Sequence, residues 1–335
     1  MGKQTTLRFG VLGAARITPK ALIQPSSELR TVEITRVAAR DRSRAEAFAS
    51  KHNIAAVSNS YQELVESPDV DVVYNPLPMN LHAEWTIAAL RAGKHVLCEK
   101  PFASNADEAR TMITEAEKAD RVLGEAFHYR YHPMFQHIID VVRSGLLGEI
   151  THVAGYFNVS IPQPDIRWDY ATSGGSLMDL GCYPLSCVRH ILGEEPTVVK
   201  ANATIGPPEH IDADIAADLA FPSGATAHIE SSMVVADDQS KDVRLEVTGS
   251  TGSITAINPL APQNGNSITI RTAAGETISK FDAGTSYAHM LRAFSNHVTH
   301  GLPFPTSGDD AIDNMAAIDA IYTAAGLPIR GVANP

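Results

Sequence analysis

A lysine ends a short apolar run in the first third of the chain, in the stretch His95-Val96-Leu97-Cys98-Glu99-Lys100-Pro101. Because proline cannot donate a hydrogen bond to a sheet, a strand in this run must stop before Pro101. A helix-like segment at 81–92 precedes the run, which is typical of parallel sheets, and open α/β sheets bind ligands outside the carboxyl ends of their strands. The sequence therefore predicts that Lys100 lies at a ligand-binding edge.

A second stretch that could do chemistry is Gly174 to Tyr183, GGSLMDLGCY. Asp179 and Tyr183 are spaced i, i+4 and would share one face of a helical turn. An acid and a phenol on one face could bind a substrate hydroxyl and move its proton, and the two glycines would let the backbone approach something closely. The spacing fits equally well a helix N-terminus with a capping acid and a core tyrosine.

The elements that must position these residues change character near residue 126. Before it, strand-like and helix-like segments alternate, which predicts a parallel sheet with helices on both faces. After it, β-like runs follow one another without helices, which predicts an antiparallel sheet, and the end of the chain is helical again. Strands are expected at 8–12, 33–38, 55–57, 70–75, 95–98, 122–126, 150–157, 198–204, 215–221, 225–232, 243–248, 253–257, 267–271 and 277–281. Helices are expected at 17–23, 43–52, 61–66, 81–92, 105–119, 133–144 and from 307 onward, with Ser43 and Asn105 as N-caps.

The first strand leads into a loop and helix with the glycine pattern of a dinucleotide-binding fingerprint. Gly13 would allow the tight turn, while Ala15 and Thr18 replace the second and third glycines. The helix N-terminus would offer N–H groups to a pyrophosphate. The residues predicted to bind a cofactor here are Gly10, Gly13, Ala15, Arg16 and Ile17.

The end of the second strand distinguishes NAD from NADP, because an acid there holds a ribose hydroxyl and an arginine suits a 2′-phosphate. Arg40 falls at this position after Ala39, and Arg44 lies close by in sequence. We therefore favour NADP(H), with these three residues in its site. NAD(H) is the alternative, with Asp41 as the ribose acid and Arg40 stacked on the adenine.

Four stretches together resemble the glucose–fructose oxidoreductase / inositol dehydrogenase / rhizopine-catabolism (Gfo/Idh/MocA) family of oxidoreductases: residues 13–17, 39–41, 99–101 and 174–183. The resemblance spans nearly the whole chain. Within the family, the chain is most similar to glucose–fructose oxidoreductase, xylose or other sugar 1-dehydrogenases and dimeric dihydrodiol dehydrogenase, which have tyrosine at the position of Tyr183. Members of the inositol dehydrogenase type have histidine there and aspartate three residues later, where this chain has Ser186.

The resemblance implies an α/β fold, with an N-terminal Rossmann doubly wound parallel sheet and a C-terminal α/β domain that has a large open, mainly antiparallel sheet. We expect residues 1–126 to bind NAD(P), and residues 127–335 to bind substrate and form oligomers, with the last helix packing back on the Rossmann domain. A homodimer or homotetramer would form through the C-terminal sheet.

The resemblance also gives Lys100 and Tyr183 catalytic roles and places Asp179 in the catalytic set as a substrate contact. A free phenol titrates near pH ~10, and a nearby ammonium lowers its pKa. Tyr183 would exchange the proton of a sugar hydroxyl, and Lys100 would tune it.

Several further residues have weaker support. In the family the loop at 75–82 lies along the cofactor, so Leu77, Pro78 and His82 are candidate contacts; a proline-stiffened turn is the equal alternative. Glu99 would orient Lys100 or contact the nicotinamide ribose, or form a structural salt bridge. The remaining substrate candidates are Arg130, Arg167 and Trp168, with a structural role favoured for the tryptophan.

Charge and composition narrow the class of partner. The formal charge is −11 without a basic run, so we expect no nucleic-acid partner. No apolar run reaches the ~18 residues of a membrane span, the first residues hold no apolar signal core, and three cysteines without zinc-type spacing suit a reducing compartment. We expect a cytoplasmic protein without a membrane partner. We also expect no metal site, because no carboxylate completes the pair His128 and His132.

These features together predict an NADP(H)-dependent oxidoreductase that transfers a hydride between nicotinamide and a hydroxyl or carbonyl of a sugar or polyol. A dihydrodiol or dicarbonyl substrate is the alternative within the same chemistry. A non-catalytic NADP-binding metabolite sensor is the alternative of another class, and the presence of both Lys100 and Tyr183 argues against it.

Overall fold

The computed structural model describes residues 6–207, 210–235 and 241–332, and the chain folds as two compact units. One comprises Met1–His128 and Tyr287–Ile312, and the other comprises Tyr129–Ser286 and Asp313–Pro335. The sequence-based domain boundary assigns everything after residue 126 to one domain, whereas helix α8 (Ser286–His300) groups almost entirely with the first unit. Phe294 of this helix packs edge-on against Phe9, with the ring centroids 6.4 Å apart.

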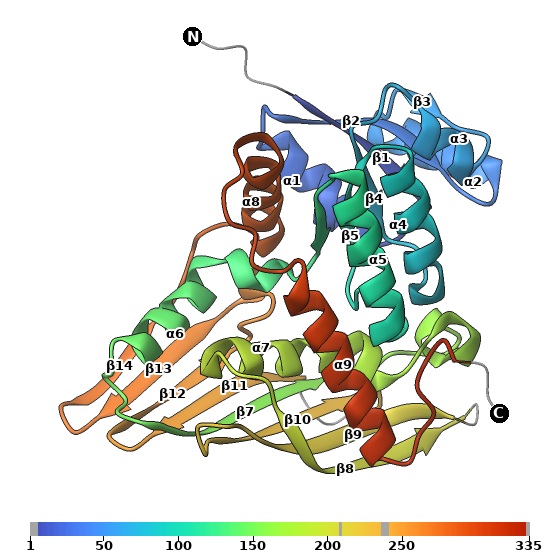
Figure 1. Ribbon diagram of the computed structural model, residues 1–335. Coiled ribbons are helices and arrows are strands. Elements are labelled where there is room, and N and C mark those ends of the chain that lie inside the picture. The colour runs from blue at the N-terminus through green and yellow to red at the C-terminus, as the bar shows by residue number, and fades with distance from the viewer. Residues whose placement is uncertain (1–5, 208–209, 236–240, 333–335) are drawn as a thin grey trace. The chain divides into compact units, whose positions relative to one another are not determined.

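The first unit contains the predicted parallel sheet. Its strands lie in the order β3-β2-β1-β4-β5-β6, and every neighbouring pair is parallel (Figure 1). The doubly wound Rossmann prediction is therefore confirmed. The strands are β1 (Leu7–Leu12), β2 (Val32–Ala38), β3 (Ala56–Val57), β4 (Val72–Asn75), β5 (His95–Cys98) and β6 (Leu123–Glu125).

Local signals explain most helices of this unit. Asn105 caps α5 by accepting a hydrogen bond from the Glu108 amide, as predicted. Ser43 is not the N-cap of α2: Asp41 accepts from the amides of Ser43 and Arg44, so the helix begins at Arg42. Besides α8, this unit has α1 (Gln24–Ser27) after a π-helical turn at Pro19–Ile23, α2 (Arg42–His52), α3 (Tyr61–Glu66), α4 (His82–Arg91) and α5 (Ala106–Ala119).

The second unit contains an eight-stranded sheet in the order β14-β13-β12-β11-β7-β10-β9-β8. Neighbours are antiparallel except β7 and β10, which run parallel because β7 is inserted between two strands that follow it much later in the chain. The prediction of a mainly antiparallel sheet is confirmed. The strands are β7 (Ile150–Asn158), β8 (Thr197–Gly206), β9 (Ile211–Ala220), β10 (Thr226–Ser232), β11 (Asp242–Gly249), β12 (Gly252–Ile257), β13 (Ser267–Thr272) and β14 (Gly275–Ser279).

Helix α7 (Cys182–Leu192) lies along one face of this sheet (Figure 1). Contact is close enough that a Cβ on Gly155 of β7 would come within 2.8 Å of the Pro184 Cβ. A π-helical turn at Leu177–Gly181 leads directly into α7. The other helices with residues in this unit are α6 (Pro133–Arg143) and α9 (Asp309–Ala324), of which the first four residues belong to the first unit.

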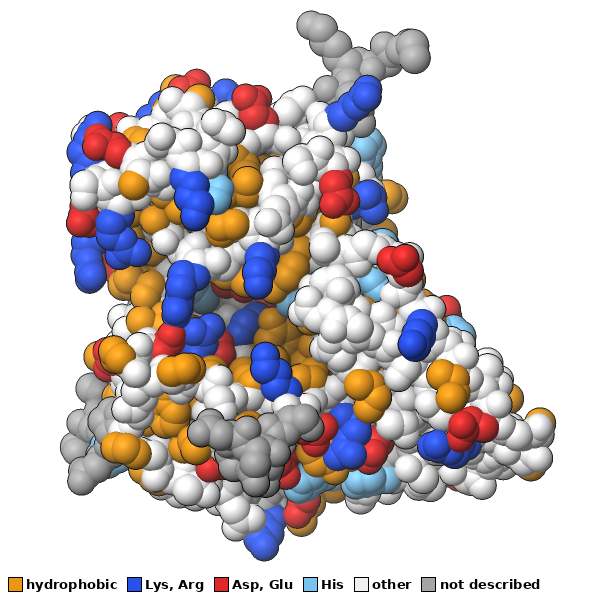
Figure 2. Space-filling model, turned by 180° about the vertical axis from the view of Figure 1, so that it is seen from behind, with side chains coloured by type: hydrophobic (Ala, Val, Ile, Leu, Met, Phe, Trp, Pro, Cys, Tyr) orange, Lys and Arg blue, Asp and Glu red, His pale blue; other side chains and the backbone are white. Residues whose placement is uncertain are grey.

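The described helices include none that is both long and apolar enough to cross a lipid bilayer. On the face shown in Figure 2, Lys and Arg side chains are interspersed with Asp and Glu side chains. Although the net charge is −11, arginine and lysine side chains lie among the acidic ones, and some of them belong to the predicted site.

Candidate active site

Four neighbouring parallel strands, β2-β1-β4-β5, end at one edge of the first sheet, and each is followed by predicted site residues. Gly13 follows β1, Ala39 and Arg40 follow β2, Leu77 and Pro78 follow β4, and Glu99 and Lys100 follow β5. This edge includes the switch point of the strand order, between β1 and β4, where open α/β sheets bind nucleotides. The structure therefore gathers these candidates along one edge.

Gly13 has φ +80°, a conformation that favours glycine, and its amide donates to the Ala38 carbonyl at 2.6 Å. A Cβ on Gly13 would lie 3.1 Å from the Leu77 side chain, so the turn and the β4 loop pack closely. The exposed Arg16 and the half-buried Ala15 and Ile17 follow in the loop.

Gly10 has a different reason to be glycine. It lies inside β1, where a Cβ would come within 2.8 Å of Leu64 and 2.9 Å of Val70. Packing therefore requires a glycine here, because the space beside Gly10 is filled by the chain itself, and the predicted contact with the cofactor stays a prediction. The helix expected at 17–23 also begins later, at Pro19, which lengthens the loop after Gly13.

Arg40 and Arg44 lie on either side of Arg42, the first residue of α2. Arg40 and Arg44 are exposed, and both lie close enough to the half-buried Tyr61 to lower its pKa, although burial dominates and raises that pKa overall. Asp41 is engaged as the helix cap, and its hydrogen bond from the Ser43 hydroxyl, the largest effect, lowers its pKa. Guanidinium groups beside a helix N-terminus suit a phosphate. Tyr61 is a member of this cluster that the sequence did not single out.

His82 does not offer a ring nitrogen to a ligand. Its Nδ1 lies 3.0 Å from the Pro101 carbonyl oxygen and its Nε2 lies 2.8 Å from that of Leu77. Burial lowers the pKa of this imidazole to about 4, which the carbonyls partly oppose. His82 therefore joins the loop after β4 to the segment that follows Lys100, and its predicted contact with the cofactor stays a prediction.

Glu99 and Lys100 leave β5 side by side. The buried Glu99 carboxylate accepts a 2.6 Å hydrogen bond from the Tyr74 hydroxyl, whose own pKa is raised well above its usual value by burial. Its other oxygen lies 3.4 Å from the Lys100 amide nitrogen. Glu99 therefore supports the backbone at Lys100, whose side chain is half-buried.

In the second unit, Arg167 and Asp179 are in direct contact. Arg167 Nε donates to Asp179 Oδ2 at 2.6 Å, and Arg167 Nη1 lies 3.0 Å from Asp165 Oδ1. The charge of Asp179, the largest effect, raises the pKa of the guanidinium. Two residues predicted separately as substrate contacts thus form one polar cluster.

Tyr183 is buried near the start of α7, which directly follows the π-helical turn that contains Asp179. Its ring packs edge-on against Phe157 at 5.6 Å and lies 6.0 Å from the ring of Tyr129. The Tyr129 hydroxyl donates to Ser186 Oγ at 2.9 Å. The rings of Phe157 and Tyr129 thus hold the Tyr183 ring in place, and Ser186 is engaged with the Tyr129 hydroxyl.

The remaining substrate candidates differ from one another. Trp168 belongs to the core: its indole nitrogen donates to the Ile161 carbonyl at 2.9 Å, and its ring joins a cluster with Leu180 and Met233. Arg130 lies over the Phe135 ring at 5.6 Å. The structural role favoured for Trp168 from the sequence agrees with these contacts.

His132 caps α6, accepting from the Met134 amide at 3.1 Å, and His128 stacks on Tyr287 at 3.9 Å. Across residues 6–207, 210–235 and 241–332, no group of three or more His, Cys, Asp or Glu is placed to hold a metal ion.

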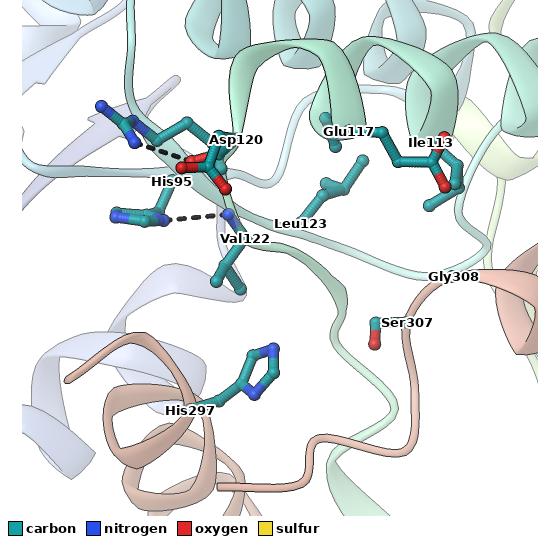
Figure 3. Close-up of a pocket in the computed structure, with 11 residues that line it drawn as sticks. His95, Ile113, Glu117, Asp120, Val122, Leu123, His297, Ser307 and Gly308 are labelled. Carbon is teal, nitrogen blue, oxygen red and sulfur yellow. Dashed lines mark hydrogen bonds between the residues drawn. The ribbon is translucent and has the colours of Figure 1, made fainter. Parts of the chain in front are cut away.

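A pocket of about 520 Å³ lies in the first unit, at the other edge of the parallel sheet (Figure 3). His95, the first residue of β5, accepts a hydrogen bond from the Val122 amide at 2.9 Å, and Leu123 begins β6. His297 and Ser307 also line this pocket. Because these positions are at the amino ends of the strands, the pocket is separate from the edge that carries Gly13 and Lys100.

The glycine pair at 174–175 approaches the protein's own atoms. A Cβ on Gly174 would lie 2.5 Å from the Arg167 carbonyl oxygen, and one on Gly175 would lie 2.2 Å from Asp212 Oδ1. Asp212 is paired with Arg330 in the core. Sequence reasoning missed this pair, because no local pattern links residues 118 positions apart.

Comparison with known proteins gives a consistent result. The model of the oxidoreductase family with an NAD-binding Rossmann fold matches residues 7–127, and that of the GFO/IDH/MocA C-terminal domain matches residues 135–255. A D-xylose 1-dehydrogenase (NADP(+)) from Haloferax volcanii is 35% identical over 326 residues, which cover 95% of this chain and 97% of the relative.

Two solved structures are similar over 96% of this chain and 98% of their own. An aldose-aldose oxidoreductase from Caulobacter crescentus, complexed with glycerol, has a TM-score of 0.88 at 27% identity. A 3-ketoreductase from Actinomadura kijaniata, in complex with NADP and TDP-benzene, has a TM-score of 0.87 at 28% identity. The latter has also been solved as a tyrosine-to-phenylalanine variant and as a lysine-to-alanine variant. The chain described here belongs to the Gfo/Idh/MocA family of oxidoreductases.

Proposed function

We propose that this protein is an NADP(H)-dependent oxidoreductase of sugars or polyols, acting on a hydroxyl or carbonyl group. The observation that carries the proposal is the shared edge of β2-β1-β4-β5, which gathers the Gly13 turn, Arg40 and Lys100. The named relatives act on sugar-type substrates, by their names, and one structure contains NADP.

The choice of NADP(H) rests on the start of α2. The 2′-phosphate would accept hydrogen bonds from the guanidinium groups of Arg40 and Arg44. Asp41 would be the ribose acid in an NAD enzyme, yet its carboxylate already accepts two backbone amides and the Ser43 hydroxyl. Leu77 packs closely against the side of Gly13 where a Cβ would lie. The backbone of the turn would then face the pyrophosphate of the nucleotide.

For the chemistry, nicotinamide supplies or accepts the hydride when it is bound. Tyr183 exchanges a proton between its phenol oxygen and the substrate oxygen, as general acid in reduction and general base in oxidation. Lys100 would support this proton exchange, because an ammonium group favours a phenolate over a phenol. Tyrosine and lysine are also the residue types varied in the solved structures of the 3-ketoreductase.

Asp179 binds a second hydroxyl of the substrate, and Arg167 fixes the carboxylate through its 2.6 Å hydrogen bond. A carboxylate that accepts from vicinal hydroxyls favours a polyhydroxylated substrate over a simple ketone. This arrangement supports sugars and polyols as the substrate class.

The experiment is a titration of the purified protein with NADPH and NADH, followed by nicotinamide absorbance with NADP⁺ and a panel of aldoses, polyols and dihydrodiols. We expect tighter binding of NADPH and turnover of an aldose or polyol. Turnover of dihydrodiols alone would transfer the assignment to that class, and NADPH binding without any turnover would contradict the enzymatic role.

A further inference from the structure

The core of the second unit contains an ion pair with no exposure to solvent. Arg330 Nη2 lies 2.6 Å from Asp212 Oδ1, and both side chains are 0% exposed. Asp212 belongs to β9, whereas Arg330 lies beyond α9, near the C-terminus. Desolvation makes a buried ion pair a weak source of net stability, so its presence calls for another role.

Both partners of the pair hold the backbone of one short segment. Arg330 Nε donates to the Gly174 carbonyl at 2.8 Å, and the Leu177 amide donates to Asp212 Oδ2 at 2.7 Å. Gly175, between these residues, has φ +141° and leaves no room for a Cβ beside Asp212. The segment 174–177 is therefore fixed from both sides by charged groups.

Aromatic rings restrict the guanidinium further. The Arg330 Cζ lies 4.3 Å from the centroid of the Tyr322 ring and 4.9 Å from that of Tyr170. The Tyr322 hydroxyl donates to Asp212 Oδ1 at 3.0 Å. A planar fork held by stacking and by hydrogen bonds on several atoms has one orientation, which a lysine could not reproduce.

The fixed segment leads directly to the proposed reacting groups. The Asp179 amide donates to the Gly175 carbonyl at 3.0 Å, and the π-helical turn containing Asp179 continues into α7, which carries Tyr183. On the other side, Gly174 packs against the carbonyl of Arg167, the partner of Asp179. A shift of the segment would therefore move both members of the Arg167–Asp179 cluster.

We propose that Asp212 and Arg330 are positioning residues, which orient Asp179 and Tyr183 toward the substrate by fixing residues 174–177. This inference rests on the proposed function. Neither residue touches the reacting atoms; the pair acts through the backbone carbonyl of Gly174 and the amide of Leu177. A displacement of about 1 Å can cost ~100-fold in rate.

The test compares Arg330→Met and Arg330→Lys with the wild-type protein. We expect kcat for the sugar to fall by about 30-fold or more in Arg330→Met, with a higher KM, and to recover little in Arg330→Lys. The NADPH dissociation constant should stay unchanged, because the nucleotide contacts proposed here lie in the first unit. The limb of the kcat/KM pH profile on which oxidation rises with pH, assigned to Tyr183 as general base, should also shift, which a loss of stability alone would not cause.

Arg189→Met is the matched control. Arg189 is 3% exposed, pairs with Glu195 at 2.6 Å, and lies toward the other end of α7, in the same unit. An equal fall in kcat in this variant, measured where both proteins are fully folded, would show a general effect of losing a buried arginine and would overturn the positioning role.

Two further outcomes distinguish failure of the positioning role from failure of the proposed function. If Arg330→Met does not fold, Tyr322→Phe removes the hydroxyl that hydrogen-bonds Asp212 and the backbone of Met178, and it should lower kcat about 3- to 10-fold. Unchanged kcat there would overturn the inference. Suppose that the wild-type protein binds NADPH and turns over a sugar, but both Arg330 variants match its kcat, KM and pH profile. The positioning role is then contradicted, and the proposed function stands. Absence of turnover in the wild type contradicts the proposed function itself.

Discussion

Arg167 donates a hydrogen bond from Nε to Asp179 Oδ2 at 2.6 Å, joining a short helical turn to the turn before α7. The contact restrains the Asp179 carboxylate, whose side chain is 11% exposed, and the same guanidinium also reaches Asp165. If Asp179 binds a substrate hydroxyl, its orientation depends on this arginine.

Arg167→Met should therefore raise the KM for the sugar by about 10-fold, the effect expected for losing one charge-assisted hydrogen bond. The NADPH dissociation constant should not change. Steady-state kinetics with the sugar varied at saturating NADP⁺ measure the effect. A KM equal to that of the wild type would remove Asp179 from the substrate contacts or Arg167 from its support.

Arg40→Ala should weaken NADPH binding by about 10- to 100-fold, since charge-assisted hydrogen bonds contribute about 1.5–3 kcal/mol. NADH binding should be unaffected because NADH lacks the 2′-phosphate. Fluorescence titration with both nucleotides measures this selectivity.

Arg42→Ala is the control for that experiment, because Arg42 lies two residues after Arg40, at the start of α2, but pairs with Glu46 at 2.8 Å. It should bind NADPH like the wild type. Parallel losses for NADPH and NADH in Arg40→Ala would mean that Arg40 contacts the adenine rather than a phosphate.

His82 should make the stability of the protein depend on pH. Its pKa is lowered from 6.5 to about 4 in the fold, mainly by burial, so the unfolded chain binds more protons between these values. Stability therefore falls as pH drops through this window, by about 2 kcal/mol between pH 7 and pH 5. Urea unfolding of wild type and His82→Gln at both pH values measures it; the same difference in both proteins would exclude His82 as the source.

The open face of the large sheet should form contacts between copies of this chain. Gly155 faces α7, so the neighbouring Tyr156 points to the opposite face, where the Arg244 guanidinium stacks on it at 4.4 Å. We expect sedimentation equilibrium to give the mass of a dimer or tetramer of the 35.9 kDa chain. In the Arg244→Glu variant this mass should be lower. A wild-type mass of one chain at micromolar concentration would contradict this prediction.

The sequence predicted elements whose signals are local. The apolar run 95–98 is the observed strand β5, and the Asn105 cap follows from a side chain and an amide three residues apart. The cap of α2 was assigned to Ser43 rather than Asp41 because both residue types cap helices and lie two positions apart.

Features that depend on distant parts of the chain were missed. Helix α8 was not among the predicted helices, although Met290, Leu291 and Phe294 have a helical apolar spacing, and only packing shows that it belongs with the first unit. The parallel pairing of β7 with β10 and the contact of Arg330 with Asp212 arise from topology. Likewise, the glycine pattern alone could not separate Gly10, required for packing, from Gly13, required for the turn.

The most direct test of the account is the NADP⁺-dependent oxidation of an aldose by the wild-type protein and by Tyr183→Phe. General acid–base catalysis contributes about 10²- to 10⁴-fold, so the variant should lose at least the lower of these factors in kcat while it binds NADPH with unchanged affinity. The aromatic contacts of the ring with Phe157 and Tyr129 do not involve the hydroxyl and should preserve the fold. Equal turnover by the two proteins would contradict the assignment of Tyr183 as the acid–base group.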